Sequence, residues 1–277
     1  MRYDALVLPN VAVLDDAQLA VLDRYVEAGG GLVATYDSSA FTAEGQPRGE
    51  FGLRSLGAGR IAARREGPHA LRSAYLRVTR REDLPESEET DFVALDRAYL
   101  YVEARAGAVP SLRLIPPERY GPPEKCYWDV ETDHPGLLWQ TYGRGKTAYF
   151  PWPLGALFFD LSLPEYRTLL VNAVAQVARG GRQVVTNAPP QVEVVVGEQA
   201  EPQRTLVHLI NYSGHQGRSF HDPLEIRDIQ LELAVSRPIR RVWSTRLAKS
   251  LAHDDSNGRI SFAVPQLNLF DLIVLED

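Results

Sequence analysis

The order of apolar and polar residues at the start of the chain predicts a strand, a helix and a second strand. An apolar run over residues 3–8 ends at a Pro-Asn pair, as a buried strand does. Asp15 then occupies a helix N-cap position, with Gln18 three residues later to complete a capping box. Apolar residues recur at helical spacing until three glycines, residues 29–31, end the helix before an apolar run over 32–36. This spacing predicts a right-handed crossover between two parallel strands.

The pattern from residue 37 to residue 181 is less regular. Residues 37–60 are rich in Gly, Ser and charge, which predicts a long loop, and residues 71–114 often alternate apolar with polar, which predicts strands of unassigned pairing. Two strand-like runs, 137–142 and 146–150, flank two glycines and predict a hairpin. Pro164 opens a further predicted helix that ends at a Gly-Gly pair.

After residue 181 the pattern changes to short strands separated by Gly, Pro, Asn and Asp. The expected strands are 192–196, 206–211, 229–233, 239–243, 260–264 and 272–275. Strands of this length and spacing are typical of a small β-sandwich. We place the boundary at residues 179–190, where two prolines would stiffen a linker, and so predict two domains, 1–180 and 190–277.

Composition and charge narrow the class of protein. The chain has 277 residues and a formal net charge of −6, with its basic residues scattered, which argues against nucleic acid or an anionic membrane as partner. Its one cysteine excludes an internal disulfide, and no apolar stretch reaches membrane-spanning length. The first residues show no signal-peptide pattern, so we expect a cytoplasmic protein in which the glycosylation sequon at Asn211 is fortuitous.

Five segments together resemble one known family. They are residues 3–10, 22–33, 142–151, 206–211 and 264–271. The first three are similar to the trimerisation domain of β-galactosidases of the family-42 glycoside hydrolase type, and the last two to the β-sandwich that follows it. The resemblance covers most of the chain.

This resemblance implies a fold class and a role. The trimerisation domain is flavodoxin-like, an α/β relative of the class I glutamine amidotransferases, and it normally has a strand, a helix and a strand before the equivalent of Tyr3. We therefore expect an N-terminally truncated flavodoxin-like domain followed by a small all-β sandwich. Family members carry their two catalytic glutamates on a TIM barrel ahead of this domain, so no catalytic residue can be carried over. The implied role is a non-catalytic oligomerisation or scaffold module, forming a homotrimer and pairing with a separately encoded barrel.

The sequence offers few candidates for catalytic groups, and none of them lies in a recognisable catalytic motif. Cys126 could act as an amidotransferase-like nucleophile with His134, but no small-residue elbow surrounds it. An acidic cluster could supply the carboxylate pair of a glycosidase, although such clusters are more often solvated loops; its members are Glu124, Asp129, Glu131 and Asp133. No His or Cys spacing typical of a metal site occurs, and we predict no cofactor.

One candidate ligand site follows the second predicted strand. Ligands bind beyond the carboxyl ends of parallel strands, where Tyr36, Asp37, Ser38 and Ser39 would form an aromatic and hydroxyl-rich rim. A plain polar loop is the simpler interpretation. A stand-alone carbohydrate-binding protein therefore remains an alternative, using this rim and any exposed member of a tryptophan set comprising Trp128, Trp139 and Trp152. A hydrolase that depends on Cys126 is the other alternative.

Overall fold

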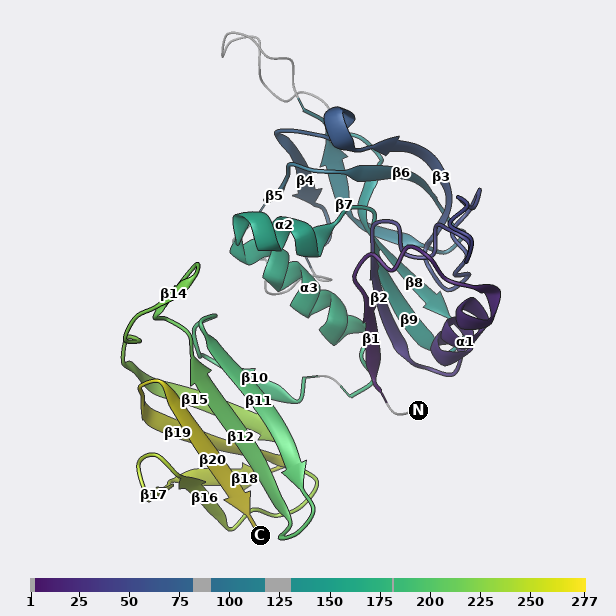
Figure 1. The fold of residues 1–277 in the computed structure, drawn as a ribbon. Helices are drawn as coiled ribbons and strands as arrows, with labels where there is room; N and C mark the ends of the chain where they lie inside the picture. The colour runs from purple at the N-terminus through teal and green to yellow at the C-terminus, as the bar shows by residue number, and fades with distance from the viewer. Residues whose placement is uncertain (1–2, 82–90, 118–130, 181) are drawn as a thin grey trace. The chain divides into compact units, whose positions relative to one another are not determined.

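A computed structural model describes residues 3–81, 91–117, 131–180 and 182–277. The chain divides into two compact units, Met1–Gly181 and Arg182–Asp277, called here the N-terminal unit and the C-terminal unit (Figure 1). Each has its own hydrophobic core.

The described part of the N-terminal unit contains strands and a smaller number of helices. In chain order these are β1 (Ala5–Leu8), α1 (Asp16–Glu27), β2 (Gly31–Thr35), β3 (Ala58–Arg65), the 3-10 helix η1 (Gly67–His69), β4 (Ala74–Val78), β5 (Phe92–Leu95), β6 (Tyr99–Ala104), β7 (Val109–Ile115), β8 (Pro135–Tyr142), β9 (Gly145–Phe150), α2 (Leu154–Leu161) and α3 (Pro164–Val177).

The predicted strand–helix–strand at the start of the chain is confirmed. β1 and β2 pair in parallel, with Leu6 beside Leu32. At the N-terminus of α1, the Asp15 side chain accepts from the Gln18 backbone N–H at 2.7 Å, and the Gln18 side chain accepts from the Asp15 N–H at 2.9 Å. This reciprocal box satisfies two donors that the first helical turn leaves free.

The expected flavodoxin-like fold class is wrong. The main sheet is mixed, with the order β1-β2-β9-β8-β7-β4-β5, and of its strand pairs only β1–β2 and β2–β9 are parallel. β9 enters as the second arm of a hairpin with β8, and β7, β4 and β5 extend the sheet by antiparallel pairing. Residues 74–78 alternate between buried and more exposed positions, which suits an antiparallel strand better than the fully buried strands of a doubly wound sheet. The unit is therefore mostly β-structure.

The helices cover both faces of the parallel part of this sheet. Val33 packs in one core with residues of α2 and α3, whereas its neighbours Leu32 and Ala34 pack in a second core with residues of α1. Figure 1 shows α1 and α3 on opposite sides of β1 and β2. The antiparallel pair β3–β6 contributes Ala58, Leu100 and Val102 to the α1 side.

The described part of the C-terminal unit consists of strands. They are β10 (Val184–Thr186), β11 (Val192–Gln199), β12 (Arg204–Asn211), β13 (His215–Gln216), β14 (Ser219–Phe220), β15 (Ile226–Ala234), β16 (Arg241–Ser244), β17 (Lys249–Leu251), β18 (His253–Ser256), β19 (Arg259–Leu267) and β20 (Phe270–Glu276).

These strands form two antiparallel sheets that share one core. One sheet has the order β10-β15-β19-β18 and the other β11-β12-β20-β16-β17. Leu231 and Phe262 from the first sheet pack in the same buried cluster as Val207 and Ile273 from the second. This is the arrangement of a β-sandwich. A separate hairpin, β13–β14, projects beyond the end of β12.

Candidate functional site

The predicted ligand rim lies at the end of β2 and its side chains are buried. Tyr36 is 7% exposed and Asp37 8%, while Ser38 and Ser39 are fully buried. Tyr36 and Ser39 also adopt positive φ values of 48° and 68°, a conformation that costs non-glycine residues free energy.

The polar atoms of this segment bond within the chain. The Tyr36 hydroxyl donates to Glu66 at 2.6 Å, and Asp37 pairs with Arg64 at 2.5 Å. Burial, together with the hydrogen bond to Glu66, raises the pKa of Tyr36. Burial also raises the pKa of the Asp37 carboxyl, against the opposing effect of Arg64. The segment anchors β2 to the β3 region, and its role as a ligand rim stays a prediction.

Only some of the other predicted groups lie within the described residues. Cys126, Glu124, Trp128 and Asp129 lie outside the described residues. Glu131 pairs with Arg77 at 3.1 Å and with Arg113 at 3.7 Å, and Asp133 pairs with Arg113 at 3.0 Å. These two carboxylates therefore form ion pairs with arginines of β4 and β7, and the roles considered for the acidic cluster stay predictions.

The aromatic candidates differ in their accessibility. The His134 ring meets the Tyr101 ring edge-on, with centroids 4.5 Å apart. Trp152 is fully buried, and its indole N–H donates to the Gly136 carbonyl at 2.7 Å. Trp139 is partly buried, donates to Ser111, and lines a pocket of about 200 Å³. Ligand pockets typically measure about 300–1,000 Å³, so this one is small.

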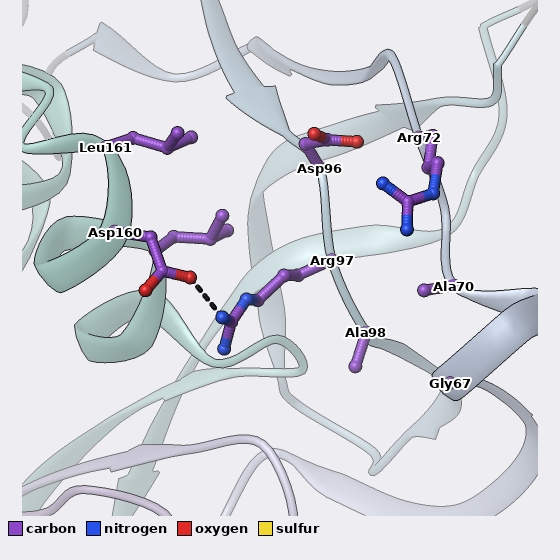
Figure 2. Close-up of a pocket in the computed structure, with 9 residues that line it drawn as sticks. Gly67, Ala70, Arg72, Asp96, Arg97, Ala98, Asp160 and Leu161 are labelled. Atoms are coloured by element: carbon purple, nitrogen blue, oxygen red, sulfur yellow. Dashed lines mark hydrogen bonds and ion pairs between the residues drawn. The ribbon is translucent and has the colours of Figure 1, made fainter.

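A larger pocket lies beside α2, and we call it the α2 pocket. Its volume is about 460 Å³ (Figure 2). The loop after η1 contributes Arg72, the β5–β6 turn contributes Asp96 and Arg97, and α2 contributes Leu157, Asp160 and Leu161. In Figure 2 the α2 residues face the β5–β6 turn across the pocket, and Arg97 reaches over to Asp160.

Short-range contacts hold these three segments together. The Leu71 N–H donates to the Arg97 carbonyl at 3.1 Å, and the Ser73 N–H donates to the Asp96 carboxylate at 3.3 Å. Arg97 forms an ion pair with Asp160. Leu157 also lines the pocket and is buried in the hydrophobic core, so packing fixes the position of α2.

This arrangement provides binding groups of both charges. Guanidinium groups donate in a fixed fork and carboxylates accept, which suits hydroxyl-bearing or carboxylate-bearing ligands. Glycoside hydrolysis needs two carboxylates that act on the substrate from opposite sides. In the α2 pocket Asp160 pairs with Arg97, and Asp96 accepts a hydrogen bond from the Ser73 N–H.

The sequence contains no signal for the α2 pocket. Arg72, Asp96 and Asp160 lie far apart along the chain and belong to no motif. The pocket forms because the loop before β4, the β5–β6 turn and α2 meet in the tertiary structure, and the alternating pattern of residues 71–114 does not specify the pairing of β4 with β5.

The described residues show two further features relevant to function. They contain no group of three or more His, Cys, Asp or Glu side chains placed to hold a metal ion. No helix among them is long and apolar enough to cross a membrane.

Comparison with known proteins places this fold among parts of glycoside hydrolases. No protein-family model matches the sequence, and no curated protein sequence matches it either. Solved structures do match, over nearly the whole chain, although sequence identity is below a fifth in each of the three cases that follow.

The matching structures are larger than this chain. An α-L-fucosidase isoenzyme 2 from Paenibacillus thiaminolyticus superposes with a TM-score of 0.76 and 18% identity, covering 99% of this chain and 41% of the fucosidase. A β-galactosidase from Bacillus circulans sp. alkalophilus gives 0.62 and 14%, covering 99% of this chain and 33% of that one. A GH42 β-galactosidase from G. stearothermophilus gives 0.59 and 14%, covering all of this chain and 32% of that one. The chain thus shares its fold with a portion of these enzymes and spans less than half of their length.

Proposed function

We propose that this chain is a non-catalytic assembly module of the kind associated with β-galactosidase-type glycoside hydrolases, and that it forms a homotrimer. The observation that carries the proposal is the match of both units, in one chain, to a third to two fifths of much longer glycoside hydrolases. Shared fold across two successive units is a more specific likeness than the fold of either unit alone.

The distribution of charged groups supports the non-catalytic part of the proposal. Among the described residues, the carboxylates of the acidic cluster and of the α2 pocket are engaged in ion pairs or backbone hydrogen bonds. A glycosidase acid or nucleophile needs to face the substrate.

The surface of α2 supports the assembly part. Phe158, Phe159 and Leu161 are 40%, 86% and 45% exposed, although α2 is a short helix. Adjacent exposed apolar residues on a monomer typically mark a protein interface, since burying them is favourable by about 25 cal/mol per Å². We assign this α2 surface, defined by these three residues, to the contact between copies of the chain.

A hydrolysis assay tests the non-catalytic role. The purified chain is incubated with p-nitrophenyl β-D-galactopyranoside and p-nitrophenyl α-L-fucopyranoside, and we expect no release of nitrophenol above the buffer rate. Turnover that is lost in both Asp96→Asn and Asp160→Asn, but retained in the surface control Asp254→Asn, would overturn the proposal.

A further inference from the structure

A third pocket lies within the C-terminal unit, at the end of the two-sheet core where the β13–β14 hairpin projects. Its volume is about 620 Å³, which is within the usual range for ligand sites. We call it the hairpin pocket, and its lining includes Tyr212, His215, Phe220, His221, Asp222 and Leu269.

The loop that forms this pocket is fixed by hydrogen bonds to the buried Asn211 side chain. The side-chain amide of Asn211 donates to the carbonyls of Leu224 and Asn268, both at 2.7 Å, and its oxygen accepts from the Ser213 N–H at 3.0 Å. Asn211 is only 1% exposed, so its amide is committed to holding the loop. At Gly214, a Cβ would lie 2.1 Å from the His221 carbonyl oxygen, so glycine permits the close approach of the two loop arms. The pocket is therefore preformed by the chain.

The apolar part of the lining is unusually exposed. Phe220 is 72% exposed, Leu269 62% and Tyr212 42%. The His215 ring stacks on the Phe220 ring with centroids 4.7 Å apart and an interplanar angle of 30°. This stacking holds the Phe220 ring in position. A ligand that packs on the ring therefore does not have to order it on binding.

The polar part of the lining is available to a ligand. No side chain among the described residues bonds to the Asp222 carboxylate or to the His221 ring, and both residues are exposed. A carboxylate accepts hydrogen bonds, and a neutral imidazole both donates and accepts. The pocket thus offers an aromatic face beside free acceptors and a donor.

These properties select one chemical class of ligand. A metal ion is disfavoured, since the described residues contain no suitable ligand cluster. A phosphate or carboxylate ligand is disfavoured because no Lys or Arg lines the described pocket and Asp222 would repel it. A wholly apolar ligand would bury Asp222 and His221 without hydrogen bonds. A pyranose ring, in contrast, has a face of C–H groups that packs on an aromatic ring and hydroxyls around its rim.

We propose that the hairpin pocket binds a neutral saccharide, with the C–H face of one pyranose ring on Phe220 and its hydroxyls bonded to Asp222 and His221. This site shares no residue with the α2 surface or with the predicted rim at Tyr36–Ser39, and it does not depend on the proposed assembly role.

Calorimetric titration of the full chain tests the proposal. The probes are methyl β-D-galactopyranoside, methyl β-D-glucopyranoside and methyl α-L-fucopyranoside. Each is titrated to millimolar concentrations, so that weak binding is also detected. We expect saturable binding of at least one glycoside at one site per chain. Methyl β-D-galacturonoside and methyl β-D-glucuronoside should bind more weakly than the galactoside and the glucoside, because the Asp222 carboxylate repels their carboxylates.

Matched variants locate the binding. Phe220→Ala and Asp222→Ala should each raise Kd by about tenfold, which is the loss of about 1.4 kcal/mol. Val21→Ala removes an exposed apolar side chain from the other unit and should leave Kd unchanged. Both pocket residues are exposed, so circular dichroism should show folded variants. Absence of saturable binding by any neutral glycoside, or binding unaltered in both pocket variants, would overturn the proposal.

Discussion

The Ser244 hydroxyl donates to the Asp271 carboxylate at 2.5 Å, and both side chains are buried in the C-terminal unit. Asp271 also accepts from the Arg246 N–H at 3.0 Å, while the Ser244 oxygen accepts from the Leu247 N–H at 3.0 Å. A carboxylate with 1% exposure therefore closes the turn after β16. Asp271 is the last residue of the C-terminal segment that resembles the β-galactosidase sandwich, and its role is structural.

Removing this carboxylate should destabilise the C-terminal unit. Asp271→Ala leaves the buried Ser244 hydroxyl and the Arg246 N–H without an acceptor, which costs roughly 1–3 kcal/mol. Hydrogen exchange of β16 and β20 measures the loss. Asp254→Ala, at an exposed position whose carboxylate bonds only locally to Ser256, should change stability by less than about 0.5 kcal/mol. Equal exchange in the two variants would contradict this account of Asp271.

The Asp37–Arg64 pair should make stability depend on pH. Because burial raises the pKa of Asp37 above its unfolded value, the folded state binds the proton more tightly. Wild-type stability relative to Asp37→Asn should therefore increase as the pH falls from about 7 towards 4, and level off once the unfolded chain is also protonated. Urea unfolding at several pH values measures this difference. A difference that shrinks as the pH falls would show that the attraction of Arg64 exceeds the cost of burial.

Two glycine substitutions should act in opposite directions. A Cβ at Gly31 would lie 2.4 Å from the Val177 carbonyl oxygen, so Gly31→Ala must displace α3 from β2 and should cost about 1–3 kcal/mol. A Cβ at Gly155, within α2, meets no atom within 4 Å, and Gly155→Ala should stabilise the N-terminal unit by about 0.4–1 kcal/mol. Thermal unfolding of both variants tests the packing. Equal melting temperatures would be inconsistent with the close approach at Gly31.

Local sequence signals predicted several elements correctly. The capping box at Asp15 and Gln18, the glycines after α1, and the Pro at the start of α3 each specify a helix end through contacts within a few residues. The β8–β9 hairpin followed from the glycines around Arg144, where Gly143 has a φ of 58°. Turn residues between short apolar runs predicted six of the eleven described strands of the C-terminal unit at about the right positions, namely β11, β12, β15, β16, β19 and β20.

Long-range pairing was not predictable in the same way. The alternating residues of β4, β5 and β7 indicate strands but do not specify their partners. In the structure these strands extend the sheet that contains the parallel strands β1, β2 and β9, whereas a flavodoxin-like fold would continue with further parallel strands and helices. α2 was missed because its short apolar run begins at Pro153, without a side-chain cap, and leaves Phe159 exposed. The α2 pocket depends on such tertiary contacts, so its residues carry no sequence signal.

The mass of the chain in solution tests the central claim most directly. Light scattering on a sizing column at micromolar concentration should give close to three times the 30.9 kDa of one chain. Phe159→Ser should shift the population towards monomer because it removes the most exposed apolar residue of the α2 surface, whereas Phe220→Ser, in the other unit, should not. A wild-type monomer, or a trimer unaffected by Phe159→Ser, would contradict the assignment of this module to self-assembly through α2.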